Sequence, residues 1–278
     1  MRIRPLQTPT PPSSTTGSAP VAQRGASQAI AKSAANTSPS PAKLDGMLLG
    51  ADGKSYPAGT PYTQVPSTQP SSGKGQGTLI FVNGMGETPA SSRGQAQRIA
   101  NATGMNVVPL YNATEGGLKD LIQSVGDTFD LGTNKAVDSL ADQVYAQLIA
   151  GQPVRLMAHS QGGLITSRAL TDVRNRLVAE GGMTRDQAQE RLGLVGVETM
   201  GSAAPSWPDG PKYVHYVNRS DFVATFLGVG RPLTHPGKDA KVVSFGRFNP
   251  FGGWFGGDGH DTSTYLKHYV PFDDAARA

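Results

Sequence analysis

A serine at a strand-to-helix turn is the feature of this sequence best suited to chemistry. The apolar run 154–158 leads through a histidine to Ser160, and an apolar helical pattern begins near Leu164. Such a turn holds a serine in a strained conformation with its hydroxyl exposed above the sheet. The turn accepts only small residues two before and two after the serine, where Ala158 and Gly162 stand. Ser160 is therefore predicted to be a nucleophile, with a merely structural turn as the alternative.

A serine nucleophile needs a general base, and the chain has five histidines. His260 follows the last strand pattern, 241–245, and stands in a Gly-rich loop before a helical pattern over 262–269. This placement predicts that His260 is the base, while His268, on the body of that helix, is the alternative. We expect His159 to pack under the turn and His215 to lie in the core of a strand. His235 is expected in a loop bounded by proline and glycine.

The acid that orients the base is expected in a loop after a strand, between the serine and the histidine. Asp221 fits, because it follows the strand pattern 212–217 through Asn218-Arg219-Ser220. A carboxylate at this place fixes the tautomer of the imidazole and stabilises the imidazolium. Asp221 also precedes a helical start, so an N-cap role is compatible with catalysis. Asp209, after the strand pattern 194–199, is the alternative acid.

Acyl transfer also requires hydrogen-bond donors for an oxyanion. The apolar run 78–82 ends in Asn83-Gly84-Met85-Gly86, where glycines let the backbone turn its N–H groups toward a substrate. We expect the N–H groups of Met85 and Gln161 to be the two donors, with Gly84 against the substrate. An ordinary strand-end turn is the alternative.

With these motifs, residues 76–270 resemble the α/β-hydrolase superfamily, and within it bacterial serine lipases and lipase-like secreted effectors. The resemblance rests on Asn83-Gly84-Met85-Gly86, the Ser160 turn, VNRSDFVA around Asp221 and GHDTSTYL around His260. The chain departs from the family pattern at Ala158, where G-x-S-x-G has glycine, and at Asn83, where histidine is more usual. The resemblance implies hydrolysis of acyl esters or thioesters through a Ser-His-Asp triad and an acyl-enzyme, without metal or organic cofactor.

The order of elements predicts an α/β fold with a doubly wound, mostly parallel sheet. Strand patterns occur at 78–82, 106–111, 154–158, 194–199, 212–217 and 241–245. Helical stripes separate them, among them Val137 to Leu148 and Leu118 to Val125. In such a sheet the active site lies at the carboxyl ends of the strands. Strand patterns precede all four motifs, those around Gly84, Ser160, Asp221 and His260. This agreement supports an active site formed by the four motifs.

The composition of the chain divides near residue 75. Residues 1–75 are rich in Ser, Thr, Pro, Ala and Gln and hold two acidic and seven basic residues, against 19 acidic and 18 basic in residues 76–278. The formal net charge of +4 thus comes from the first segment, and no nucleic-acid-binding face is predicted for the rest. We expect 1–75 to be a disordered tail with small islands such as 46–49 docked on the core, and 76–278 to be the catalytic domain.

The tail lacks the apolar core of a Sec-type signal peptide, and the chain has no run of about 18 apolar residues that could span a membrane. Its first 44 residues contain no acid. They resemble the secretion signals of type III effectors of bacterial pathogens, which implies delivery into a host cell and a secretion chaperone or host target as partner. An organelle transit peptide, a spacer and a cytoplasmic protein are the alternatives. The chain has no cysteine, which excludes disulfides and thiol catalysis.

Aromatic residues stand among glycines in the segment 248–257, just before His260. We expect Phe251, Trp254 and Phe255 to bind substrate, as part of an acyl pocket, a lid or an anchor in peripheral contact with a membrane. The alternative is that these aromatic side chains only cover the edge of the sheet. Lipid ester hydrolysis is therefore the expected function. A short-chain carboxylesterase or acyl thioesterase is the alternative of the same class, and a non-catalytic protein-interaction module is the alternative of another class.

Overall fold

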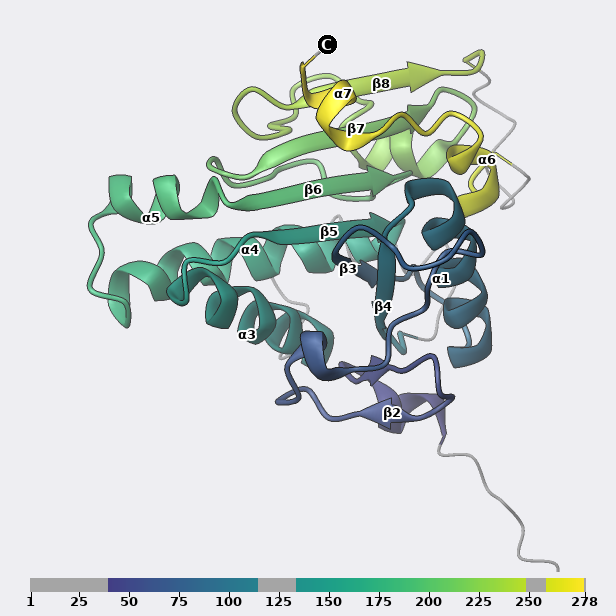
Figure 1. Ribbon diagram of the computed structural model, residues 1–278. Coiled ribbons are helices and arrows are strands. Elements are labelled where there is room, and N and C mark those ends of the chain that lie inside the picture. Colours follow the sequence, from purple (N-terminus) through teal and green to yellow (C-terminus); the bar gives the residue numbers. More distant parts are fainter. Residues whose placement is uncertain (1–39, 115–133, 249–258, 278) are drawn as a thin grey trace, which may run out of the picture. The chain divides into compact units, whose positions relative to one another are not determined.

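The computed structural model describes residues 40–114, 134–248 and 259–277, and within them an eight-stranded sheet forms the centre (Figure 1). Its order is β2-β1-β4-β3-β5-β6-β7-β8. The strands are β1 (Leu48–Leu49), β2 (Ser55–Tyr56), β3 (Thr78–Val82), β4 (Asn106–Leu110), β5 (Val154–His159), β6 (Val195–Met200), β7 (Lys212–Asn218) and β8 (Lys241–Phe245). All pairs from β4 to β8 are parallel, while β1 runs antiparallel to β2 and β4.

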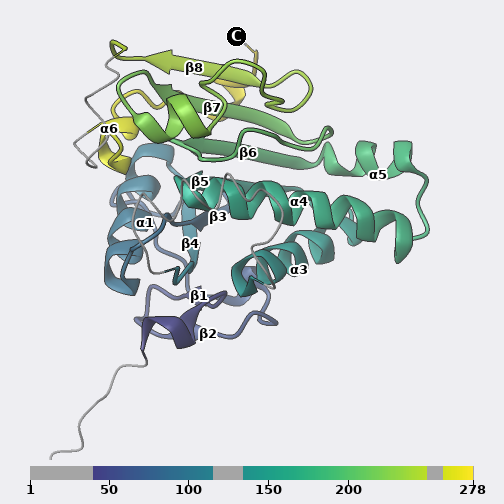
Figure 2. The same ribbon diagram turned by 180° about the vertical axis from the view of Figure 1, so that it is seen from behind.

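Helices cover both faces of this sheet. They are α1 (Pro89–Thr103), α3 (Lys135–Ile149), α4 (Gln161–Ala179), α5 (Arg185–Leu192), α6 (Thr262–Leu266) and α7 (Phe272–Arg277), with the short turns η1 (Pro41–Leu44), η2 (Tyr62–Gln64) and η3 (Val223–Leu227). In Figure 1 α7 lies over β7, and in Figure 2 the same sheet is seen from behind, with α3 and α4 in front. None of the described helices is both long and apolar enough to cross a bilayer.

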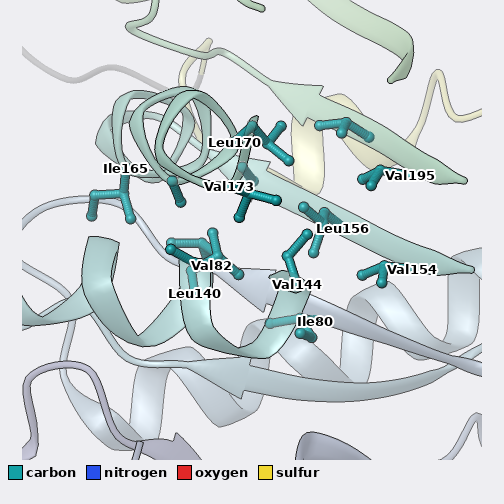
Figure 3. Packing of buried hydrophobic residues seen from close by; sticks show 14 of the residues in the cluster. Ile80, Val82, Leu140, Val144, Val154, Leu156, Ile165, Leu170, Val173 and Val195 are labelled. Atoms are coloured by element: carbon teal, nitrogen blue, oxygen red, sulfur yellow. The ribbon is translucent and has the colours of Figure 1, made fainter. Parts of the chain in front are cut away.

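The two apolar layers follow from the alternation of side chains along β3. Leu79 and Phe81 face α1, α6 and α7, whereas Ile80 and Val82 face α3 and α4. Figure 3 shows the second layer, in which side chains of α3 and α4 pack against β3, β5 and β6. Both layers are fully buried at the centre, which fixes the register of the strands that carry the site.

The order of the strands reverses at β3. The chain passes from β3 to β4 on one side and then returns to β5 on the other side, so β3 pairs in parallel with both. In an open parallel sheet, a ligand site is expected at such a reversal, outside the carboxyl ends of the strands. Asn83 follows β3 and Ser160 follows β5, so both residues lie at this point.

The expected α/β class, the mostly parallel sheet and the six strand patterns are confirmed, with boundaries shifted by at most one residue at either end of each strand. The helix expected over 262–269 is shorter and ends at Leu266. The stripe from Leu118 to Val125 lies outside the described residues.

The expected disorder up to residue 75 is wrong for residues 40–75. Leu48 and Leu49 are fully buried, and β1 extends the sheet at β4. Gln143 of α3 holds this segment, because its Oε1 accepts from the N–H of Tyr62 at 2.9 Å and its Nε2 donates to two carbonyls at 58 and 60. The segment from Ser40 is accordingly part of the same compact unit as the sheet. Residues 1–39, with most of the expected secretion signal, lie outside the described residues.

Candidate active site

Ser160 occupies a strained turn between β5 and α4. Its φ of 56° and ψ of −125° fall in a region that residues other than glycine rarely adopt. Its N–H donates to the carbonyl of Met200 at the end of β6, at 3.1 Å, and its carbonyl accepts from the N–H groups of Gly163 and Ala203. Neighbouring strand, helix and loop thus hold the serine in its conformation, as the sequence predicts for a nucleophile turn.

Two glycines allow the end of β3 to pack against this turn. A Cβ on Gly162 would lie 2.3 Å from the carbonyl oxygen of Val82, and a Cβ on Gly84 would lie 2.9 Å from the Cβ of Ser160. Both positions therefore exclude larger residues. Ala158, two residues before the serine, is fully buried in β5.

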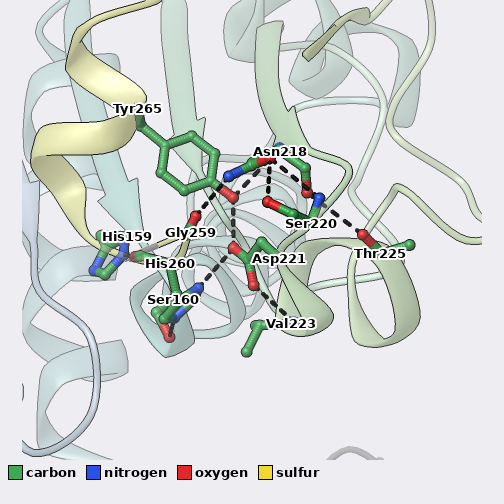
Figure 4. Close-up of polar contacts among 10 residues, drawn as sticks. All are labelled: His159, Ser160, Asn218, Ser220, Asp221, Val223, Thr225, Gly259, His260 and Tyr265. Atoms are coloured by element: carbon green, nitrogen blue, oxygen red, sulfur yellow. Dashed lines mark hydrogen bonds and ion pairs between the residues drawn. The ribbon is translucent and has the colours of Figure 1, made fainter. Parts of the chain in front are cut away.

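Ser160, His260 and Asp221 form one hydrogen-bonded chain (Figure 4). Nδ1 of His260 donates to Oδ2 of Asp221 at 2.7 Å, and its Nε2 lies 2.8 Å from Oγ of Ser160. Because Nδ1 carries the proton that faces the carboxylate, Nε2 is free to accept the proton of the serine hydroxyl. The three residues that the sequence selects as nucleophile, base and acid are thus brought into contact.

Asp221 is only 1% exposed, and its carboxylate accepts three hydrogen bonds. Oδ1 accepts from the N–H of Val223 at 2.8 Å, and Oδ2 accepts from both His260 and the hydroxyl of Tyr265. Burial, with the nearby Asp221 charge, raises the pKa of Tyr265 well above its ordinary value, so its hydroxyl remains a donor. This contact could not be predicted from the sequence, where Tyr265 is one residue of a short helical pattern.

Asn218 joins the loop of the acid to the loop of the base. Its Oδ1 accepts from the N–H and the hydroxyl of Ser220, while its Nδ2 donates to the carbonyl of Gly259 at 2.9 Å. Asn218 ends β7, and Gly259 directly precedes His260. The two loops are therefore held together at one buried side chain.

A buried amide network connects the two turns that carry the expected oxyanion donors. Asn83 donates from Nδ2 to the carbonyls of Gly84 and Asn112, and its Oδ1 accepts from the N–H of Asn112. Asn112 in turn donates to Oε1 of Gln161 at 2.7 Å. Gln161 begins α4, so its N–H has no acceptor within the helix, and Met85 lies in the turn after Gly84. The oxyanion role of Met85 and Gln161 stays a prediction, and Asn112 is a supporting residue that the sequence did not reveal.

The alternative acid and the alternative base lie in other contacts. Asp209 is partly exposed and pairs with His235 at 2.9 Å, and it also accepts from the N–H of Lys238 at 2.7 Å. His268 stacks on Phe245 with ring centroids 3.9 Å apart.

The remaining two histidines are buried. His215 lies between the hydroxyl of Thr199 and the carbonyl of Pro236, and burial lowers its pKa to about 4. His159 lies under the turn, where its ring approaches His260 at 4.8 Å between centroids. These are the core positions that the sequence predicts for both.

An apolar cluster adjoins the chain of three residues. Its buried members are Ala203, Val223 and Leu227, and Met85, Leu164 and Phe222 pack against them. Phe226 stacks on Phe222 at 4.7 Å and is 40% exposed, and Phe248 approaches Phe226 at 6.2 Å. Phe251, Trp254 and Phe255, which the sequence assigns to substrate binding, lie outside the described residues.

In the described part of the chain, no three acidic or histidine side chains gather so as to hold a metal ion. No family model matches the sequence, and no curated protein is significantly similar to it.

Proposed function

We propose that the protein is a serine hydrolase that cleaves acyl esters, and that its substrates are lipids. The observation that carries this proposal is the continuous chain from Oγ of Ser160 through His260 to the buried carboxylate of Asp221. Acyl transfer requires a nucleophile, a base that contacts the nucleophile and an acid that contacts the base. We further assign the sheet to the doubly wound α/β-hydrolase fold, because the serine turn lies at the strand reversal between β3 and β5.

The reaction follows from the contacts. Oγ of Ser160 attacks the carbonyl carbon of the ester while Nε2 of His260 takes the hydroxyl proton, and Asp221 stabilises the resulting imidazolium. The N–H groups of Met85 and Gln161 receive the negative charge on the carbonyl oxygen. When the tetrahedral intermediate collapses, His260 returns the proton to the leaving alkoxide. Water then repeats these steps on the acyl-enzyme and releases the acid.

The apolar cluster supports a lipid as substrate. Its Ala203 donates a backbone hydrogen bond to the carbonyl of Ser160, and its Val223 donates one to Asp221. The backbone of the apolar cluster is therefore bonded to the nucleophile and to the acid. An acyl chain attached to Ser160 would lie beside this surface, and each methylene that it buries contributes about 0.8 kcal/mol.

A chain-length series tests the substrate. Hydrolysis of p-nitrophenyl esters with acyl groups from two to sixteen carbons should reach its highest kcat/KM with the longer chains. Phe226→Ser should lower that preference and leave acetate hydrolysis unchanged, because Phe226 stacks on Phe222 of the apolar cluster and is no member of the hydrogen-bonded chain of three residues. A maximum at acetate would instead favour a short-chain carboxylesterase or thioesterase. No turnover with any ester would favour a non-catalytic interaction module.

Delivery out of the producing cell is part of the proposal, and it rests on the composition of the first 44 residues. Removal of residues 1–39 should leave ester hydrolysis and the melting temperature unchanged, since the described contacts of the sheet and the site all come from Ser40 onward. The same truncation should block export in a secretion assay. Export of the truncated protein would contradict a secretion signal in this segment.

A further inference from the structure

His159 contacts the backbone of the proposed base. Its Nε2 lies 2.7 Å from the carbonyl oxygen of His260, and the two imidazole rings are 4.8 Å apart at a tilt of 37°. A carbonyl oxygen can only accept a hydrogen bond, so Nε2 of His159 carries a proton and donates it. His159 itself is buried at the end of β5, next to Ser160 in the chain.

The ring of His159 is held neutral by its surroundings. Burial and, next, the neighbouring His260 lower the pKa of His159 to about 4, against weaker opposing effects of the His260 carbonyl, Asp221 and Asp261. Tyr265 presents its ring edge-on at 6.5 Å. Since the proton is on Nε2, Nδ1 is bare, and it has no partner among the described residues. A neutral ring at this place adds no positive charge beside the imidazolium that His260 must become during the reaction.

The contact completes the support of the base. The carbonyl that precedes His260, at Gly259, accepts from Nδ2 of Asn218, and the carbonyl of His260 itself accepts from His159. Nδ1 of the ring is bound to Asp221. The base is therefore held at two consecutive carbonyls and at one ring nitrogen, by side chains from β5, the end of β7 and the acid loop.

On the premise that the proposed function holds, we propose that His159 is a positioning residue for His260. Its neutral Nε2–H fixes the backbone of the base, so that the imidazole remains in line between Ser160 and Asp221. A displacement of the ring by a fraction of an ångström lengthens the contact with Oγ of Ser160, and a proton transfer in the reaction depends on that distance.

A pair of matched variants tests this role. In His159→Gln the amide nitrogen can reach the place of Nε2 and donate, whereas His159→Met has similar length but no donor. The measurement is the second-order rate of labelling of Ser160 by a fluorophosphonate, together with kcat and KM for a p-nitrophenyl ester. We expect His159→Met to lower the labelling rate and kcat by about ten- to a hundredfold with little change of KM. His159→Gln should recover most of the loss.

Equal labelling rates in the two variants, at equal melting temperatures, would show that His159 only packs under the turn. A wild-type protein that is not labelled would contradict the proposed function itself, and with it the premise of this role. Should the variants not fold, long-range nitrogen NMR of the wild-type histidines gives a decision. His159 must carry its proton on Nε2 and must not titrate between about pH 5 and pH 8, and a proton on Nδ1 or a titration in that range overturns the inference.

Discussion

The hydroxyl of Tyr265 donates its hydrogen bond to Oδ2 of Asp221, the same oxygen that accepts from His260. One oxygen of the proposed acid thus accepts two hydrogen bonds. A hydrogen bond to a carboxylate stabilises its charged form, and Tyr265 supplies one such bond to Asp221. It also holds the carboxylate in place from the side opposite the N–H of Val223, which donates to the other oxygen.

Replacement of Tyr265 by phenylalanine should lower kcat. Without this donor, the carboxylate of Asp221 keeps only the hydrogen bonds from His260 and from the N–H of Val223, so it is held less firmly behind the base. Steady-state hydrolysis of a soluble ester should show a loss of kcat of about three- to tenfold, because the reaction depends on the position of the base. Tyr216→Phe is the matched control, because it removes a buried hydroxyl that donates to Val270 instead. If both variants keep the wild-type kcat, Tyr265 does not support the acid.

Asp221→Asn and Asp209→Asn separate the two candidate acids. An amide at position 221 presents a donor to Nδ1 of His260 and so favours the wrong tautomer of the base, which should lower kcat by about 10⁴-fold. Asp209 pairs with His235, so Asp209→Asn should keep nearly full activity. Steady-state hydrolysis of one soluble ester decides between them. The assignment fails if the second variant is the inactive one.

Gly162→Ala and Gly94→Ala should have opposite effects on stability. A methyl group at position 162 would lie 2.3 Å from the carbonyl oxygen of Val82, so α4 must move away from β3. A methyl group at position 94, within α1, meets only the end of Arg98 at 4.0 Å, and alanine is a better helix former than glycine by about 1 kcal/mol. Urea unfolding should show a clear loss of stability for Gly162→Ala and a gain of up to about 1 kcal/mol for Gly94→Ala. A gain of stability in both variants would mean that the close approach of α4 and β3 does not contribute to the stability of the fold.

Glu198 should make the folded state less stable as the pH rises. It is 1% exposed in β6, and burial raises its pKa to about 7 in spite of Arg155 at 3.4 Å. The folded state thus keeps a proton that the unfolded chain has already lost, and stability falls between about pH 4.5 and about pH 7. Glu198→Gln removes this dependence. Relative to the wild type, the variant should gain on the order of 2–3 kcal/mol between pH 5 and pH 8 in unfolding experiments. Parallel pH profiles of the two proteins would contradict a buried carboxyl that stays protonated.

The strands and Ser160 could be predicted because their signals are local. Runs such as 78–82 are apolar and short, and the turn at Ser160 needs small residues at fixed positions within five residues of chain. His260 and Asp221 follow from the order of elements alone, because parallel strands bring their carboxyl ends to one edge of the sheet.

The supporting contacts could not be predicted, because each joins residues far apart in the chain. Asn112 reaches Gln161, and Tyr265 reaches Asp221, through amide or hydroxyl groups that are ordinary in either local context. Residues 40–75 were wrongly predicted to be disordered for a related reason. Their Pro- and Ser-rich composition indicates disorder, but Gln143 of α3 and the edge of β4 supply the hydrogen bonds that the segment cannot make within itself.

Labelling with a fluorophosphonate decides whether Ser160 is an activated nucleophile. Wild-type protein and Ser160→Ala are incubated with the probe, and the modified peptide is identified by mass spectrometry while the melting temperature of both is recorded. We expect stoichiometric modification of the wild type at Ser160, none in Ser160→Ala, and similar melting temperatures, since within the described residues the replaced hydroxyl is bonded to His260. A wild-type protein that stays unmodified, or modification at another residue, would contradict an activated serine at the end of β5.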